Sequence, residues 1–340
     1  MSDPVVTLPR AWGGPAGSGS LRVTPEDFQV VEDLGLEPSG AGEHVLLKIR
    51  KRNLNTLEVA RHIARLAGVR PRDVSYAGLK DRVAVTTQTF SVYLPGKADP
   101  DWKALEGDNL RVIEAARHHR KLRRGTLRGN RFHLRIPDFH GDAGLLSERL
   151  EQIAGNGVPN YFGSQRFGRE GSNLQRAQAL FAGELKKVRR DKRGIWLSAA
   201  RSWLFNLVLA ERVRQGNWNQ LLEGDVMQLA AGSGQFRAEG DENLIERLQR
   251  QEVHVTGPLC GRPSRALEPE GAAMELESSV LSGHSSWIHG LRRFGLDADR
   301  RALRMPVQAL EWNRDGSVLE LNFFLPPGSY ATVVVRELLG

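Results

Sequence analysis

The chain of 340 residues lacks the features that mark secreted, membrane-spanning and zinc-binding proteins. Its single cysteine, Cys260, excludes a disulfide framework within the chain and any zinc site built from several cysteines. No apolar run approaches the ~20 residues that a membrane-spanning helix needs, and the first residues show no basic segment followed by an apolar one. We therefore expect a cytoplasmic protein that is not bound to a membrane.

The sequence also lacks the common short motifs of nucleotide-, metal- and serine-dependent enzymes. It contains no GxxxxGK[ST], no HExxH and no GxSxG. The histidines are mostly isolated, and His118 and His119 are adjacent rather than spaced to share one face of a helix. We expect neither a metal site nor a cofactor.

What the chain does have is an excess of positive charge. Lys and Arg number 48 against 40 Asp and Glu, for a formal net charge of +8. The excess is concentrated in a first basic stretch (117–131), with seven Lys and Arg and no acid, and a second basic stretch (186–193), with six and one Asp. One charge run is usually a solvated face, but two on a basic chain favour RNA or DNA as a partner.

Hydrophobic periodicity predicts strands near both ends of the chain and helices in its middle. Strands are expected as a pair within 21–33 around a Pro-Glu-Asp turn, and at 44–52, 83–94 and 130–139. Helices are expected at 56–69 with Thr56 as a cap, and at 143–156, 195–216 and 271–294. A hairpin is expected around 313–316, with Asp315-Gly316 in its turn. This order favours one sheet built from strands of both ends, with the middle inserted.

The densest group of chemically capable residues lies in SYAGLKDRVAVTTQTFSV (75–92). Asp81 is ionised at neutral pH and can serve as a nucleophile or base. If it is buried it needs a cationic partner. Lys80 points to the opposite face if both lie on a strand, so Arg22 is at least as good a partner. The competing interpretation makes Asp81 an ordinary turn or capping residue.

At this segment a family resemblance emerges. AGLKDRVAVTTQ (77–88) resembles the GxKDxxAxTxQ signature of the TruD family of tRNA pseudouridine synthases. Six further blocks are similar to that family in the same order, at 22–35, 42–56, 117–132, 157–168, 196–206 and 325–338. The resemblance covers essentially the full chain, and ordered blocks are far more specific than one short motif.

The resemblance implies roles for seven residues. Asp81 matches the catalytic aspartate, and Arg22 the basic residue that pairs with it, here holding it ionised in a dry pocket. The other five match positions around the target uridine: Phe28, Lys80, Asn130, Phe132 and Tyr330. The Phe28 and Phe132 rings are expected to sandwich the uracil. Tyr330 stands where the family has phenylalanine, and the role of Lys80 is left open. Without the resemblance, the three rings read as strand core and Asn130 as a turn residue.

The resemblance also implies a fold and a reaction. The fold is α/β (α+β): a pseudouridine-synthase domain with a mixed, mainly antiparallel sheet (1–155 and 306–340), and an inserted α/β domain (156–305). The reaction converts uridine 13 of tRNA to pseudouridine after base flipping, with Asp81 as nucleophile or base and without a cofactor. We expect tRNA as the partner, no protein partner, and a monomer.

Three other functions compete with this one. A general basic scaffold is disfavoured because it gives no reason for the placement of the aromatic residues and of Asn130. A non-catalytic tRNA- or RNA-binding protein of the same fold is disfavoured by the complete set of Asp81, Asn130 and Phe132. A different RNA-modifying enzyme, such as a methyltransferase, needs a glycine-rich strand–helix turn for its cofactor, and none is present.

Overall fold

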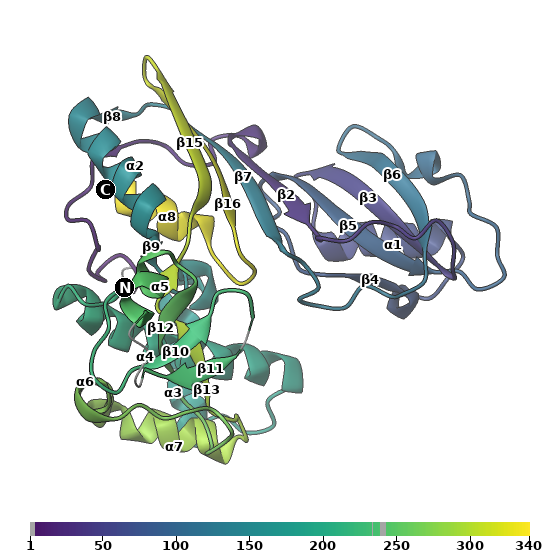
Figure 1. Ribbon diagram of the computed structural model, residues 1–340. Helices are drawn as coiled ribbons and strands as arrows, with labels where there is room; N and C mark the ends of the chain where they lie inside the picture. Colours follow the sequence, from purple (N-terminus) through teal and green to yellow (C-terminus); the bar gives the residue numbers. More distant parts are fainter. Residues whose placement is uncertain (1–3, 233, 239–242) are drawn as a thin grey trace. The chain divides into compact units, whose positions relative to one another are not determined.

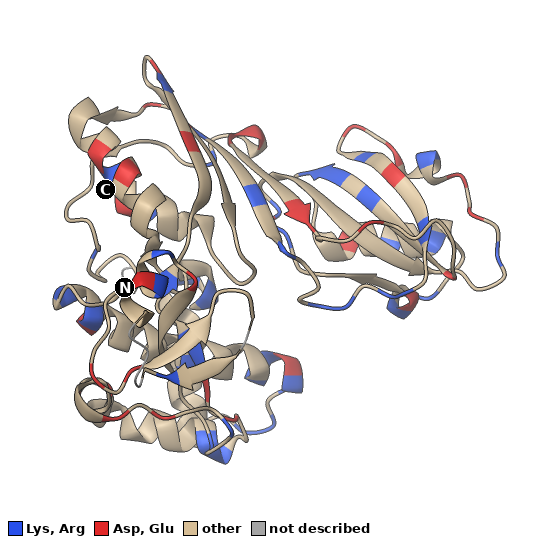
Figure 2. Cartoon of the chain, in the orientation of Figure 1, with Lys and Arg blue, Asp and Glu red and all other residues tan. Residues whose placement is uncertain are grey.

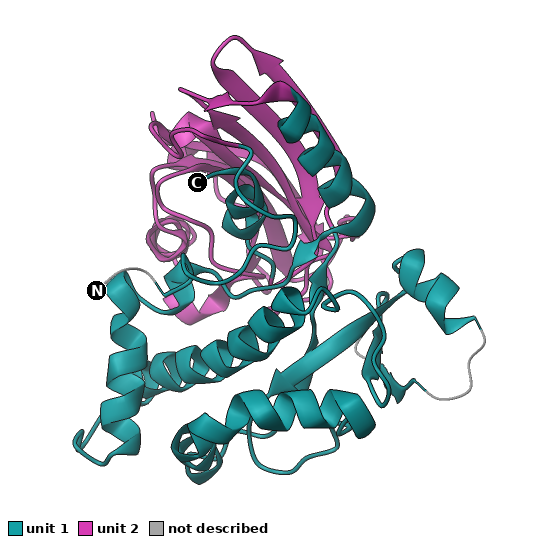
Figure 3. Cartoon of the chain, turned by 90° about the vertical axis from the view of Figure 1, so that its left-hand side faces the viewer, with its two compact units in different colours: residues 1–16, 144–306, 329–340 teal, residues 17–143, 307–328 magenta. Residues whose placement is uncertain are grey.

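The computed structural model describes residues 4–232, 234–238 and 243–340. They form two compact units (Figure 3). The sheet unit comprises residues 17–143 and 307–328, and the helix-rich unit comprises residues 1–16, 144–306 and 329–340.

The sheet unit is built around one large mixed sheet (Figure 1). Its strands in spatial order are β15 (Gln308–Asp315), β16 (Val318–Leu325), β7 (Gly129–Ile136), β2 (Phe28–Asp33), β5 (Val85–Tyr93), β3 (His44–Arg52) and β6 (Leu110–His118), and β4 (Val74–Tyr76) also pairs with β5. All neighbours are antiparallel except β2 and β5, which are parallel. A short ribbon pairs β1 (Gly17–Ser18) with β8 (His140–Gly141).

Helix α1 (Thr56–Leu66) covers one part of this sheet because its apolar residues fall on one face. Val59 and Ile63 are fully buried against Leu47, Ile49 and the apolar residues of β5. The opposite face of the helix carries its charged residues. The sheet unit also contains the short 3-10 helices η1 (Pro25–Asp27), η2 (Pro71–Asp73) and η3 (Trp102–Leu105).

The helix-rich unit contains a smaller antiparallel sheet and most of the helices. The sheet has the order β11 (Gln235–Arg237), β10 (Val226–Leu229), β12 (Val253–Leu259) and β13 (Asp299–Ala302), and a separate ribbon pairs β9 (Val158–Pro159) with β14 (Arg304–Met305). The helices are α3 (Ser172–Phe181), α4 (Arg190–Arg214), α5 (Leu244–Gln249), α6 (Gly271–Leu281), α7 (Ser285–Arg293) and α8 (Ala331–Leu338). The 3-10 helices η4 (Ser164–Arg166) and η5 (Arg169–Gly171) precede α3, and η6 (Ser282–His284) separates α6 from α7. Helix α2 (Ala143–Asn156) begins at the boundary of the two units.

Helix α4 is the longest of the described helices and forms the centre of the helix-rich unit. Its Leu197, Ala200 and Leu204 pack with Leu180 of α3 and Leu291 of α7. No described helix is both long enough and apolar enough to cross a membrane.

The expected fold class is confirmed: the sheet is mixed and mainly antiparallel, and strands from both ends of the chain share it. The strands expected at 44–52, 83–94 and 130–139 and the C-terminal hairpin are present. The turn of the hairpin lies at Gly316-Ser317, one residue later than expected. The domain boundaries that the sequence predicts, at 155/156 and 305/306, stay a prediction.

Four local expectations were wrong. Residues 21–24 form no strand, since Arg22 has a φ of +56° and η1 follows directly. The cap of α1 is Asn55 rather than Thr56. Helix α4 begins at Arg190, so it takes in part of the second basic stretch, and the helix expected at 271–294 is divided at η6.

Candidate active site

The carboxylate of Asp81 is held by an arginine that precedes β2 in the sequence. Arg22 Nη2 donates to Asp81 Oδ2 at 3.0 Å, and the Arg22 guanidinium carbon lies 3.9 Å from the centre of the Phe28 ring. Asp81 Oδ1 accepts no hydrogen bond from any described residue. The Asp81 side chain is 41% exposed, so a substrate can reach it. The dry pocket expected around this ion pair is therefore not present in the structure.

The backbone at Arg22 supports this arrangement. Its φ of +56° lies in the left-handed region, where a side chain with a Cβ costs about 1–2 kcal/mol. Such conformations persist only where the surrounding contacts hold them. Here the guanidinium is fixed on both sides, by the Asp81 carboxylate and by the Phe28 ring.

The two predicted stacking rings, Phe28 and Phe132, are in contact with each other. Their centroids are 6.1 Å apart and their planes cross at 74°, while Phe132 is stacked on Phe323 at 5.4 Å. Both side chains are buried. The structure thus shows an edge-to-face pair and not two facing rings, so a uracil between them requires the rings to part.

Lys80 belongs to a buried network of its own. Its Nζ lies 2.9 Å from Glu32 Oε2 and donates to Asn130 Oδ1 at 2.6 Å. Glu32 and Asn130 are directly opposite on β2 and β7, so their side chains share one face of the sheet. Glu32 Oε1 also accepts the backbone N–H of Thr89, at 3.0 Å. The carboxylate of Glu32 is completely buried, and Lys80 is what compensates its charge.

These contacts link six of the seven predicted residues. Arg22 contacts Asp81 and Phe28, the Phe28 ring contacts that of Phe132, and Lys80, the neighbour of Asp81, contacts Asn130 two residues before Phe132. All of them lie in the sheet unit. The seventh, Tyr330, lies in the helix-rich unit, where its hydroxyl accepts a hydrogen bond from Arg166 Nη2 at 2.8 Å.

Sequence reasoning missed two buried charges in this region, Glu32 and Lys51. Lys51 Nζ donates to the carbonyl oxygens of Leu54 at 2.7 Å and of Asp81 at 3.1 Å. Burial lowers the pKa of Lys51 to about 8, although the nearby charge of Asp81 acts in the opposite direction. The alternation of inward and outward side chains along a strand could have indicated that both residues are buried. Lys51 continues the inward positions 45, 47 and 49 of β3, and Glu32 continues the inward positions 28 and 30 of β2.

Thr56 and Gln88 hold the loop that carries Lys80 and Asp81. The Thr56 hydroxyl donates to Gln88 Oε1 at 2.8 Å and accepts the backbone N–H of Lys80 at 3.1 Å. Gln88 Nε2 donates to the Gly78 carbonyl at 3.3 Å. Both side chains are buried, so Thr56 serves this loop rather than capping its helix.

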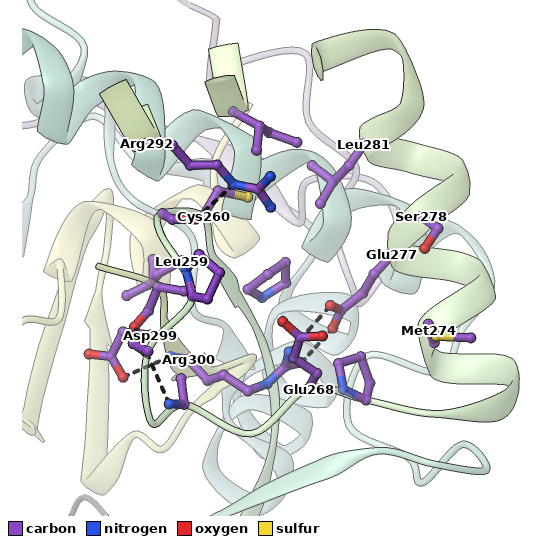
Figure 4. Close-up of a pocket in the computed structure, with 18 of the residues that line it drawn as sticks. Leu259, Cys260, Glu268, Met274, Glu277, Ser278, Leu281, Arg292, Asp299 and Arg300 are labelled. Atoms are coloured by element: carbon purple, nitrogen blue, oxygen red, sulfur yellow. Dashed lines mark hydrogen bonds and ion pairs between the residues drawn. The ribbon is translucent and has the colours of Figure 1, made fainter. Parts of the chain in front are cut away.

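A cavity of about 550 Å³ lies in the helix-rich unit, between β12 and helices α6 and α7 (Figure 4). It contains none of the predicted site residues. Its charged residues Arg300 and Glu277 form an ion pair, and Arg300 Nε donates to Thr256 Oγ1 at 2.7 Å. Burial raises the pKa of the Cys260 thiol to about 11, so it is not a nucleophilic thiolate at neutral pH. The described residues contain no cluster of three or more His, Cys, Asp or Glu able to hold a metal ion.

Comparison with known proteins assigns the chain to a family. The family model for tRNA pseudouridine synthase D (TruD) matches residues 10–187 and 171–338. A tRNA pseudouridine synthase D of Methylococcus capsulatus is 50% identical over 98% of this chain and 94% of its own length. The corresponding protein of Stutzerimonas stutzeri is 46% identical over 100% and 98%.

A solved structure has the same fold. The crystal structure of a candidate tRNA pseudouridine synthase D from Methanosarcina mazei superimposes with a TM-score of 0.75. It is 21% identical and covers 99% of this chain and 97% of its own, so at this identity the likeness concerns the fold. Because the family model and the curated relatives both extend over nearly all of the sequence, this chain belongs to the tRNA pseudouridine synthase D family.

Proposed function

We propose that this protein converts uridine 13 of tRNA to pseudouridine and that Asp81 supplies the catalytic carboxylate. The observation that carries the proposal is the partly exposed Asp81, held by Arg22 beside the Phe28 ring, in a chain of this family. An oxygen that accepts no hydrogen bond from the described residues can approach a substrate atom directly.

The reaction is an isomerisation whose atoms balance without a co-reactant. The bond between N1 of the base and C1′ of the ribose breaks, the uracil turns, and a bond forms between C5 and C1′. The proton on C5 leaves and N1 gains one. Asp81 acts as the nucleophile or base in this sequence.

Arg22 positions the Asp81 carboxylate through its ion pair at 3.0 Å. Its guanidinium lies over the Phe28 ring, which limits the directions in which it can donate. The Asp81 side chain is partly open to water in the structure, so the flipped base itself must displace that water. On this reading an Arg22→Ala variant loses most of its activity.

Asn130 and the aromatic rings are proposed to receive the flipped uridine. The amide of Asn130 offers both donors and an acceptor, and Lys80 fixes its orientation by donating to Oδ1. Flipping costs a few kcal/mol of lost base stacking. Stacking on an aromatic ring stabilises the flipped base by about 1–3 kcal/mol, provided that Phe28 or Phe132 exposes a face of its ring.

The test uses an unmodified tRNA transcript with uridine at position 13 and a matched transcript with cytidine there. After incubation with wild-type protein, pseudouridine is mapped by chemical labelling and primer extension. The proposal expects one modified position, 13, in the first transcript and none in the second. Pseudouridine at another position would show that position 13 is not the target. Tight binding without pseudouridine formation would favour a non-catalytic tRNA-binding protein.

A further inference from the structure

The segment VPNYFGSQRFG (158–168) builds an aromatic platform in the helix-rich unit. At its centre is Phe162, whose backbone N–H and C=O are both bonded to the side chain of Asn206 on α4, at 2.9 and 3.0 Å. Asn206 is fully buried. The rings of Phe205 and Tyr330 contact Phe162 edge to face, at 5.5 and 6.4 Å. The position of the Phe162 ring is thus fixed from several sides.

Two arginines lie against this one ring. The guanidinium carbon of Arg301 is 4.2 Å from the Phe162 centroid and that of Arg166 is 5.4 Å from it. Arg301 Nη2 donates to Asn160 Oδ1 at 2.6 Å. Burial lowers the pKa of Arg301 to about 10, and the charge of Arg166 acts in the same direction. At this pKa Arg301 is still cationic at neutral pH.

Arg166 is held by neutral groups. Its Nη1 donates to Ser198 Oγ at 3.1 Å and its Nη2 to the Tyr330 hydroxyl at 2.8 Å, while Nε is buried without a hydrogen-bond partner among the described residues. In the described part of the chain no carboxylate lies within 4.0 Å of this guanidinium. The side chain is half-buried, so it has lost part of its hydration but can still be reached. A half-buried Arg166 without a carboxylate beside it favours an incoming anion, and the neighbouring Arg301 adds a second positive charge.

We propose that Arg166 and Arg301, oriented by Tyr330, Ser198 and Asn160 on the Phe162 platform, form a binding site for a phosphodiester of the RNA backbone. Each Nη of Arg166 carries a second N–H beyond the bond it already makes, and a planar fork suits two phosphate oxygens. The occupant is taken to be a phosphate of tRNA, and in this respect the inference rests on the proposed function.

The proposed phosphate site also assigns a role to the Tyr330 hydroxyl. A phenylalanine at this position would keep the ring contact with Phe162 but would leave Arg166 Nη2 without its acceptor. Tyr330 is therefore inferred to be a positioning residue that acts through Arg166.

The experiment measures the Kd of wild-type protein and variants for an unmodified tRNA transcript at several KCl concentrations. Arg166→Gln is expected to raise Kd about five- to tenfold and to reduce the slope of log Kd against log salt by about 1, because one phosphate contact is lost. Arg166→Lys keeps the cation and so keeps the slope, with Kd raised about two- to threefold. Tyr330→Phe likewise raises Kd about two- to threefold at an unchanged slope.

Arg214→Gln is the matched control. Arg214 lies on α4, the helix that carries Ser198, and is paired with Glu211 at 3.0 Å, so its removal should leave the slope unchanged. Equal slopes for Arg166→Gln and Arg214→Gln would overturn the proposal. So would an equal loss of slope in Arg166→Lys and Arg166→Gln, since that would indicate a structural role.

The same preparations separate this inference from the proposed function. If the wild type forms no pseudouridine but Arg166→Gln still reduces the salt slope, the phosphate site stands and the reaction is different. If the wild type modifies uridine 13 and the slopes are equal, the reaction stands and the phosphate site is wrong. Thermal unfolding of each variant verifies that it is folded.

Discussion

At the scale of single residues, the buried pair of Glu32 and Lys80 holds the side-chain amide of Asn130 in one orientation. We predict that Glu32→Gln lowers the free energy of unfolding by about 3 kcal/mol, because it leaves the buried Lys80 ammonium without its counter-charge. The single-turnover rate of pseudouridine formation should fall by about two orders of magnitude, since Lys80 no longer holds Asn130 in one orientation.

A double-mutant cycle tests whether Glu32 and Lys80 contribute to the free energy of unfolding as a pair or independently. Lys80→Met and the double variant Glu32→Gln/Lys80→Met are unfolded in urea beside the single variants. The double variant should be clearly more stable than the sum of the single losses predicts, yet it should remain as inactive as either. Simple additivity of the losses would contradict the account.

Lys51 makes a prediction about pH. Its pKa is about 8 in the folded protein against a usual 10.5, so between these values the unfolded chain binds the proton and the folded chain does not. Stability therefore rises with pH across this range, by up to about 3 kcal/mol from this group. Below pH 8 both states are protonated and the contribution is constant.

The measurement is urea unfolding of wild type and Lys51→Met between pH 7 and 10. The stability of the wild type relative to Lys51→Met should increase from pH 8 upward, and it should be flat below. Parallel curves over the whole range would show that Lys51 has an ordinary pKa.

Sequence reasoning could predict part of this network. The Arg22–Asp81 pair was foreseeable because Lys80 was expected to point away from Asp81. Glu32 and Lys51 were missed because a charged residue at the inward phase of a strand looks like an exception to the apolar pattern. Burial of a charge depends on partners that are distant in sequence, such as Lys80 for Glu32.

At the scale of elements, the pairing of strands β7 and β16 leaves no room for a side chain at Gly129, the neighbour of Asn130. A Cβ on Gly129 would lie 2.2 Å from Phe324 Cζ and 2.4 Å from the carbonyl oxygen of Leu325. The second atom belongs to the backbone of the paired strand, so the strand itself would have to move. We predict that Gly129→Ala costs about 1–3 kcal/mol of stability and slows pseudouridine formation by displacing Asn130.

Gly107→Ala is the control for this change, because a Cβ there meets no atom within 4 Å. Urea unfolding and single-turnover kinetics are measured on both variants. If Gly129→Ala were as stable and as fast as Gly107→Ala, the close approach of the strands would have no part in shaping the site.

Strands with a clear period of two were predictable, and so was helix α2. The conformation of residues 21–24 was not, because the contacts that hold Arg22 at a positive φ come from Asp81 and from the ring of Phe28. The break at η6 contains no proline, and its one local signal, Gly283, was not used because a single glycine within a helical pattern does not by itself end a helix.

At the scale of the whole molecule, positive charge is spread over both units, with several cations along β3 (Figure 2). Not every cation of the two basic stretches is available to RNA. Arg117 is paired with Asp99 and donates to the carbonyls of Leu94 and Lys97, so its role is structural. Among the described residues, the exposed cations with no carboxylate within 4.0 Å include Arg123 and Arg124 in the first stretch and Arg190 and Lys192 in the second.

We predict that charge reversal at either exposed pair weakens tRNA binding. Arg123→Glu/Arg124→Glu and Arg190→Glu/Lys192→Glu should each raise Kd at least tenfold at moderate salt and reduce the salt slope by about 1–2. Arg61→Glu/Arg65→Glu, on the exposed face of α1, changes the net charge equally and controls for long-range effects. Equal slopes in all three variants would remove the two stretches from the RNA-binding surface.

The central claim is that the Asp81 carboxylate performs the chemistry. The most direct measurement is single-turnover pseudouridine formation on a uridine-13 tRNA transcript by wild type and Asp81→Asn, with the Kd for tRNA determined in parallel. We predict product from the wild type and none from Asp81→Asn, at a Kd within about threefold of wild type, since the amide keeps the size of the side chain but not its charge. Equal rates in the two proteins would move the catalytic role to another residue.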